Sequence, residues 1–301
     1  MKTARPPSTS GSALLLVLWA LFVLSAAVLA YVNVVMVQLK RAGDSNRALE
    51  AKAMAHSGLA IALHPMVTEK TPLLEEAFND QMGYRVRIIG EGGKLNINYL
   101  LQGEDPRKLD ILRHWLEYHG LTFQERDRLI DCLLDWTDGD NIKRLNGVED
   151  EDTYHPANRP FQSIDEMEEV AGMEPLLAVP GWRDEVTIYS QGQIDLSAAT
   201  EATLRLLPGM SEPRIARFLE IRRGRDGVDG TLDDVEFKTL KDIGNALGFG
   251  QAQMKALSGL VVQKDQTVRI ISEGQSADIV RQVEVVARKS GASPAIVLWK
   301  E

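Results

Sequence analysis

The sequence has one long apolar segment near its start, and no charged residue occurs between Pro6 and Leu39. The continuous part begins at Ser12. It is longer than the roughly 20 apolar residues that a helix needs to cross the hydrocarbon layer of a membrane. The rest of the chain has the composition of an ordinary globular protein. The sequence therefore predicts a folded body attached to a single N-terminal transmembrane helix, over residues 12–39.

A short basic leader, MKTARPPSTSG, precedes the apolar segment over residues 1–11. An ordinary signal peptide has an apolar core of about 7–15 residues and a small-residue cleavage site, so this segment fits poorly. A plain signal anchor remains an alternative. A basic leader that ends in a glycine before an uninterrupted apolar helix resembles the leader of type IV pilins and pseudopilins. That resemblance implies that a membrane peptidase cleaves between Gly11 and Ser12 on the cytoplasmic side.

Composition limits the possible functions of the body. The net charge is −9 and the sequence pI is about 5.2, which disfavours nonspecific nucleic-acid binding by the chain as a whole. The single cysteine, Cys132, excludes an intrachain disulfide, and the five scattered histidines disfavour a zinc site. We find no dinucleotide-binding, phosphate-loop, metalloprotease or nucleophile-elbow motif. These observations favour a protein that is not an enzyme.

Periodicity predicts an α+β fold with a large helical insert. The N-terminal helix should continue to His64, because Pro65 disfavours helix there. Alternation predicts a hairpin of strands at 84–89 and 94–100 around a GEGG turn. Further strands are expected at 267–272, 280–289 and 295–299, and the residues between are largely helical. The expected units are a leader (1–11), a transmembrane helix (12–39), a helix with the first strands (40–101), the helical insert (102–265) and the last strands (266–301).

Two stretches of the insert have the pattern of helix-hairpin-helix units, at 169–177 and 206–215. In each, a Gly-Met pair follows one predicted helix and precedes another, and glycine supplies the backbone conformation that such a turn requires. Such units can present turn amides to phosphate. Six arginines surround the second unit and make DNA binding a competing hypothesis: Arg205, Arg214, Arg217, Arg222, Arg223 and Arg225.

The strongest chemical feature is an acidic loop over residues 133–163. Calcium takes about 6–8 oxygen ligands from a flexible loop, and clustered carboxylates repel one another unless a cation joins them. A solvated acidic loop is the plainer alternative, and a two-metal hydrolase is disfavoured because the cluster is local. Residues 226–234 form a weaker candidate, and Asp135 is a less favoured ligand because its side chain is expected to face the helix. The predicted Ca²⁺ ligands are Asp138, Asp140, Glu149, Asp150 and Asp152.

Several segments together resemble protein K of the general secretion pathway, a minor pseudopilin of type II secretion systems. They are Gly11 before the apolar helix, LNINYL from Leu95, LDWTDGD from Leu134, NGVEDEDTY from Asn146, NRPFQSIDEMEEVAGM over 158–173, and QIDLSAAT over 193–200 followed by LPGM. The resemblance implies a pseudopilin fold with a large helical insert and structural calcium in the acidic loop. Asp195 and Ser197 stand where the family has asparagine, and Ser12 is an unusual first mature residue.

The resemblance also implies a function and partners. The chain would sit in the bacterial inner membrane with its body in the periplasm. It would initiate or cap the pseudopilus tip, aid protein export, and contact the I- and J-type minor pseudopilins, the major pseudopilin and the prepilin peptidase. Most pseudopilins have glutamate at the fifth mature position, whereas this chain has Leu16, as protein K typically lacks that carboxylate. The alternative is a minor pilin of a type IV pilus or DNA-uptake system.

Overall fold

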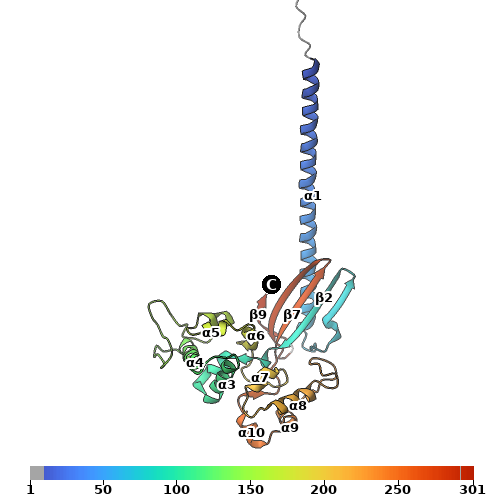
Figure 1. Ribbon diagram of the computed structural model, residues 1–301. Coiled ribbons are helices and arrows are strands. Elements are labelled where there is room, and N and C mark those ends of the chain that lie inside the picture. The colour runs from blue at the N-terminus through green and yellow to red at the C-terminus, as the bar shows by residue number, and fades with distance from the viewer. Residues whose placement is uncertain (1–9, 292) are drawn as a thin grey trace, which may run out of the picture.

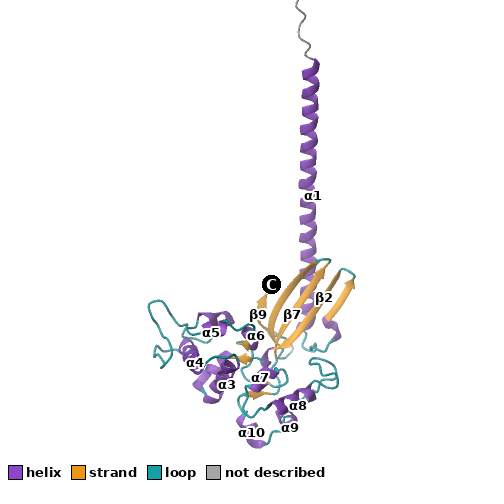
Figure 2. Ribbon diagram, in the orientation of Figure 1, coloured by secondary structure: helices purple, strands orange, loops and turns teal. Residues whose placement is uncertain are grey.

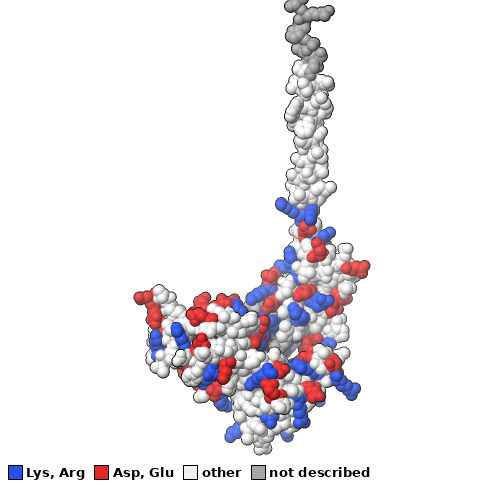
Figure 3. Space-filling model, in the orientation of Figure 1, with Lys and Arg blue, Asp and Glu red and all other residues white. Residues whose placement is uncertain are grey.

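The computed structural model describes residues 10–291 and 293–301, so residues 1–9 of the predicted leader lie outside the described residues. Its first element, α1 (Ser10–Leu63), is an unbroken helix of 54 residues. The helix extends from the body as a straight rod (Figure 1). Over the described residues, α1 is the one helix long and apolar enough to cross a membrane. Figure 3 shows the rod free of charged side chains until close to the body. The predicted long helix is confirmed.

The lower part of α1 packs on an antiparallel sheet (Figures 1 and 2). Within the described residues this sheet has five strands, in the order β1-β2-β7-β8-β9. Their bounds are β1 (Glu75–Asn79), β2 (Met82–Gly90), β7 (Thr267–Ser276), β8 (Ile279–Arg288) and β9 (Ala295–Lys300). The three C-terminal strands confirm the sequence prediction, whereas β1 was not predicted. Every side chain of β1 is exposed, so that strand has no apolar alternation to detect.

Helix α1 and strand β7 approach each other very closely at Gly274. A Cβ atom on Gly274 would lie 2.1 Å from the carbonyl oxygen of Ala51 and 2.2 Å from the amide nitrogen of Ala55. The hydroxyl of Ser272 donates a hydrogen bond of 2.7 Å to the carbonyl oxygen of Ala55. Around this contact, the small and apolar side chains of helix and sheet form one buried cluster, which includes Leu59, Tyr84, Val86, Ile270, Val283 and Val285.

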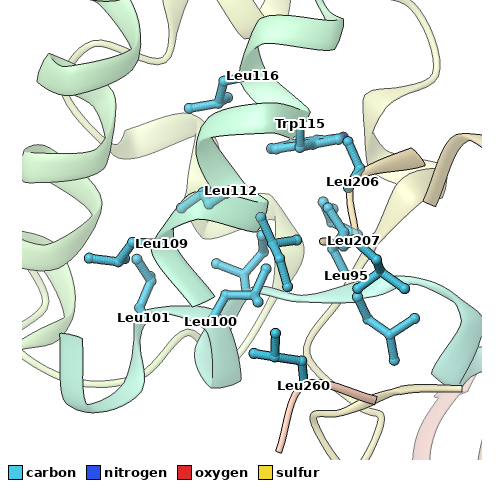
Figure 4. Packing of buried hydrophobic residues seen from close by; sticks show 14 of the residues in the cluster. Leu95, Leu100, Leu101, Leu109, Leu112, Trp115, Leu116, Leu206, Leu207 and Leu260 are labelled. Carbon is cyan, nitrogen blue, oxygen red and sulfur yellow. The ribbon is translucent and has the colours of Figure 1, made fainter. Parts of the chain in front are cut away.

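The chain between β2 and β7 forms a separate body beyond the sheet, at the end away from the rod (Figure 1). Its core is a second cluster of leucines and aromatic side chains (Figure 4). Trp115 and Leu112 of one helix lie at its centre, and both are almost fully buried. The α-helices are α2 (Ile97–Leu101), α3 (Pro106–Tyr118), α4 (Phe123–Thr137), α5 (Glu174–Leu177), α6 (Trp182–Glu185), α7 (Glu201–Arg205), α8 (Glu212–Arg222), α9 (Leu240–Ala246) and α10 (Gln251–Ala256).

Short strand pairs and turns of 3-10 helix connect these helices, and one further 3-10 turn, η1, lies between α1 and β1. Strand β3 pairs in parallel with β4, and β5 pairs in parallel with β6. The bounds of these elements are β3 (Leu95–Asn96), β4 (Val186–Thr187), β5 (Ile194–Asp195), β6 (Val261–Val262), η1 (Pro72–Leu74), η2 (Glu91–Gly93), η3 (Gln102–Glu104) and η4 (Ile164–Glu169).

The predicted hairpin between strands 84–89 and 94–100 is wrong. Strand β2 pairs with β1 and β7 instead, and the chain becomes helical at Ile97. The side chain of Asn96 caps that helix by accepting a 3.0 Å hydrogen bond from the amide of Tyr99. Residues 95–101, which we assigned to the first unit, pack in the core of the insert. Ile97, Leu100 and Leu101 also have helical spacing, and burial on that face outweighs the apparent alternation.

The helical prediction for the middle of the chain is correct in outline and varies in detail. Thr122 and Glu125 form the expected capping box at the start of α4. Ser163, by contrast, caps a 3-10 helix through the amide of Asp165. The pattern at 206–215 lies on the turn between α7 and α8, where Gly209 has φ of 79°. The pattern at 169–177 joins only η4 to the single-turn helix α5.

A buried ion cluster joins the sheet to the insert. The carboxylate of Glu91, which follows β2, is fully buried. It accepts hydrogen bonds of 2.8 and 3.1 Å from the guanidinium of Arg269 on β7, and one of 2.7 Å from the hydroxyl of Thr187 on β4. The ammonium of Lys94 lies 3.8 Å away. One carboxylate thus contacts both bodies and fixes the insert against the sheet.

Candidate cation site in the acidic loop

Three carboxylates from the end of α4 and the loop that follows it converge on one point. They belong to Asp135, Asp138 and Glu149, and one ligand oxygen from each lies within 4.8 Å of the others. Asp135 is fully buried, and Glu149 is 5% exposed. Asp138 is partly buried at the C-cap of α4. The helix supplies two of these groups three residues apart, and the returning loop supplies the third.

The loop is held against α4 by contacts that bring Glu149 into place. The backbone amide of Asn146 donates a 3.1 Å hydrogen bond to the carboxylate of Asp131, and the side-chain amide of Asn146 donates another of 3.0 Å. Gly147 lies directly on Asp135, because a Cβ atom there would be 1.8 Å from an Asp135 carboxylate oxygen. A side chain at position 147 would therefore displace the Asp135 carboxylate.

Arg144 contacts the cluster from one side. Its Nη1 atom donates a 2.6 Å hydrogen bond to Oδ1 of Asp135 and also bonds Oδ2 of Asp138. Its Nη2 atom donates a 2.8 Å hydrogen bond to Glu104, and its backbone amide donates to Asp135. Sequence reasoning did not identify Arg144, although a basic residue inside so acidic a loop is a signal that could have found it.

The other side of the cluster consists of carboxylate oxygens without donors. Among the residues that the structure describes, none donates a hydrogen bond to Oε1 or Oε2 of Glu149, or to Oδ1 of Asp138, and all three atoms are buried. Burial, together with the neighbouring carboxylates of Asp135 and Asp138, raises the pKa of Glu149 above its ordinary value. A buried carboxylate without a donor is costly. These oxygens fit a hard cation such as Ca²⁺, which takes oxygen ligands.

The structure brings together some of the predicted ligands and leaves others apart. Asp138 and Glu149 are in the cluster, as is Asp135, the less favoured candidate. Asp140 is exposed and accepts a 2.8 Å hydrogen bond from the amide of Ile142. Asp150 is exposed and pairs with His155, and Asp152 is exposed. The last three carboxylates lie outside the converging group, because the loop turns them toward solvent.

The weaker acidic stretch, 226–234, uses its carboxylates within its own loop. Asp233 accepts hydrogen bonds from the amides of Arg225 and Asp226, which contribute, after the hydroxyl of Thr231, to a pKa lowered to about 2. Asp234 accepts a 2.7 Å hydrogen bond from the amide of Gly230. These contacts explain the acidic residues as loop-forming groups without a cation.

Four of the six arginines around the α7–α8 turn are engaged within the chain. Arg205 pairs with Glu201 and Glu212. Both Arg222 and Arg223 pair with Asp229. Arg214 donates a 2.6 Å hydrogen bond to the carbonyl oxygen of Gly209, in the turn itself. Because neighbouring carboxylates neutralise three of these guanidinium groups, the geometry gives no support to DNA binding at this turn.

Comparison with known proteins relates both the sequence and the fold to one family. Residues 93–178 match the family model described as type II secretion system (T2SS), protein K. The type II secretion system protein K of Dickeya chrysanthemi is 30% identical over 74 residues, which are 24% of this chain and 21% of that protein. This sequence match therefore spans about a fifth of the relative's length.

The fold comparison covers far more of the molecule. A chain in the crystal structure of the GspK–GspI–GspJ complex from the enterotoxigenic Escherichia coli type 2 secretion system superposes with a TM-score of 0.59 at 14% sequence identity. The superposition covers 87% of this chain and 98% of that chain. The chain is therefore similar in sequence to type II secretion system protein K over part of its length, and it has the pseudopilin fold.

Proposed function

We propose that this protein is a minor pseudopilin of a type II secretion pseudopilus, anchored in the bacterial inner membrane with its body in the periplasm. The observation that carries the proposal is the combination of an exposed apolar rod with a family-specific insert. The similar complex contains GspI and GspJ by name. We therefore propose the corresponding two minor pseudopilins as partners, with the major pseudopilin below them and the prepilin peptidase as the processing enzyme.

The tip position is supported by the place of the insert. It lies beyond the sheet, at the end away from the rod (Figure 1). In a filament whose rods bundle side by side, a bulky body at that end obstructs the addition of another subunit above it. The chain would thus initiate or cap the pseudopilus and in this way aid export.

The lower half of α1 offers the surface for lateral contacts. One of its faces packs on the sheet through Ala51, Ala55 and Ala62, which are fully buried. The opposite face exposes small residues, including Ala53 and Ala60. Small residues allow helices to approach closely, a principle established for membrane helices and applied here to the part near the membrane.

We expect Ala53→Arg to weaken the complex with the other two minor pseudopilins. The long charged side chain would separate helices that pack through small residues. The measurement is co-purification of the full chain with both partners from detergent-solubilised membranes. Ala252→Arg on α10, another exposed alanine, is the matched control and should leave the yield unchanged. Failure of the wild-type chain to retain either partner would contradict the proposed assembly.

We also propose that the acidic loop binds a structural Ca²⁺ ion through Asp135, Asp138 and Glu149. Bound ion stabilises the native state by mass action, and this amounts to about 2.7 kcal/mol at a concentration 100 times the Kd. Chelation should therefore lower the melting temperature of the full chain by about 5 °C, and Ca²⁺ should restore it. Asp138→Asn and Glu149→Gln should abolish this response.

The outer carboxylates provide the control for the metal prediction. Asp140, Asp150 and Asp152 remain predicted ligands, and the double variant Asp150→Asn/Asp152→Asn tests two of them directly. An unchanged response to chelator in that variant would restrict the site to the converging three. A wild-type chain that contains no metal by elemental analysis and ignores both chelator and Ca²⁺ would leave only a solvated acidic loop.

Processing is expected between Gly11 and Ser12 by a prepilin peptidase on the cytoplasmic face. The mature chain would then begin within the apolar helix and retain its membrane anchor. N-terminal sequencing of the protein from membranes measures the cleavage site. A mature end near Asn33 or beyond would identify an ordinary signal peptide instead.

A further inference from the structure

Arg144 is the cationic side chain that contacts both aspartates of the cluster, and it does so on one side only. We propose that Arg144 is a specificity-determining residue of the cation site, which sets the net charge of the cluster and thereby favours divalent over trivalent ions. This inference rests on the proposed Ca²⁺ site and adds a role that the ligands themselves do not explain.

The geometry allows the guanidinium and a cation to share the cluster. Nη1 of Arg144 donates hydrogen bonds to Oδ1 of Asp135 and Oδ2 of Asp138. Oδ1 of Asp138 and both oxygens of Glu149 are buried and receive no hydrogen bond from any described residue. The guanidinium of Arg144 thus contacts one oxygen of each aspartate, while Oδ1 of Asp138 and both oxygens of Glu149 are left for an ion. Its second bond, of 2.8 Å to Glu104, holds the guanidinium from outside the cluster.

The net charge of the cluster determines which ions it favours. Within the cluster, three ionised carboxylates carry three negative charges, and one guanidinium leaves a net charge of minus two, which a divalent ion neutralises. Glu104 is solvated, because its side chain is 57% exposed, and it lies outside this balance. The repulsion between Arg144 and a trivalent ion is one and a half times the repulsion between Arg144 and a divalent ion. At a separation of about 6 Å and an effective dielectric constant of about 20, one additional unit of charge changes affinity by roughly 100-fold. Ionic screening reduces this, so a change of about tenfold or more is expected.

The test compares the affinities of the full detergent-solubilised chain for Ca²⁺ and Tb³⁺. Calorimetry measures both ions, and Tb³⁺ luminescence excited through Trp136, the residue after Asp135, reports binding at this loop. Arg144→Gln should raise the Tb³⁺ to Ca²⁺ affinity ratio by about tenfold or more. Arg144→Lys keeps the charge but loses the planar fork, so it should weaken both ions while leaving the ratio near the wild-type value.

These measurements distinguish an electrostatic role of Arg144 from a purely structural one. A purely structural role predicts that both variants weaken the two ions alike, and an unchanged ratio in Arg144→Gln would overturn the proposal. Arg144→Met, which keeps an unbranched stem, is measured if the glutamine variant does not fold. A wild-type chain that binds neither ion would refute the Ca²⁺ site itself, and with it this role of Arg144. Wild-type binding with an unaltered ratio refutes only the role of Arg144.

Discussion

Replacing Glu91 by alanine is expected to destabilise the folded body by about 3–5 kcal/mol, the cost of breaking a buried ion pair by removing one partner. Glu91 is fully buried, and its loss would leave the guanidinium of Arg269 without two of its hydrogen bonds. It would also remove the acceptor for the Thr187 hydroxyl. Chemical denaturation of the full chain, followed by tryptophan fluorescence, measures the change.

The difference in stability between the wild type and the isosteric variant Glu91→Gln should depend on pH. Burial raises the pKa of Glu91, but hydrogen bonds from Arg269 and the charges of Lys94 and Arg269 outweigh it, so the net pKa lies below the ordinary 4.5. The stabilisation by the carboxylate is therefore fully present above pH 4.5 and is lost as the pH falls through the lowered value. The free energy of unfolding of the wild type should therefore exceed that of Glu91→Gln above pH 4.5, and this difference should shrink only in that acidic range.

An exposed ion pair offers the control for Glu91. Glu75 pairs with Arg85 on the sheet surface, and both side chains are more than half exposed. Because water already solvates such a pair, Glu75→Ala should leave stability nearly unchanged. Equal losses in Glu75→Ala and Glu91→Ala would contradict the role assigned to the buried cluster.

Gly274→Ala is expected to destabilise the contact between α1 and the sheet by about 3 kcal/mol or more, the upper part of the range for overpacking. The added methyl group would lie 2.1 Å from the carbonyl oxygen of Ala51 and 2.2 Å from the amide of Ala55. These are backbone atoms of a helix, so no flexible side chain can move aside. The melting temperature of the full chain measures the loss.

Gly43→Ala is the matched control for Gly274. It lies on the exposed part of α1, and a Cβ atom there would meet nothing within 4 Å. Alanine has the higher helix propensity, so stability should stay equal or rise by up to about 1 kcal/mol. A wild-type melting temperature in Gly274→Ala would show that helix and sheet do not approach as closely as described.

The parts of the fold that the sequence predicts correctly are those with long or regular patterns. The rod was predictable because charge is absent over its whole apolar length, and β7, β8 and β9 because their β-branched residues occur in runs bounded by turns. Residues 94–100 were predicted incorrectly because the apolar residues in so short a stretch fit both the helical period and the strand period. The helix at Ile97 is decided by packing against the insert core, which local spacing does not encode.

The site was predicted at the level of the loop and only partly at the level of residues. Asp138 and Glu149, two of the predicted Ca²⁺ ligands, lie in the converging carboxylate group, and their binding of an ion stays a prediction. Asp135 was disfavoured because its side chain was expected to face the helix, yet its place on the buried side of α4 is what brings it beside the other two. The run at 149–152 contains four acidic residues, and the backbone direction that turns only Glu149 inward depends on the contacts of Asn146 and Gly147. No spacing rule reports those contacts.

The way the insert joins the sheet determines how the protein would bear mechanical load. Gly90 at the end of β2 pairs with Val268 near the start of β7, so the chain leaves and re-enters the sheet at neighbouring points. A pull on the insert against the rod would therefore load both strands from the same end and in the same direction, so the force would pass from them to their outer neighbours β1 and β8 and to α1. Glu91 follows β2 and Arg269 lies on β7, so the ion cluster joins the two loaded strands at the end where the force enters the sheet.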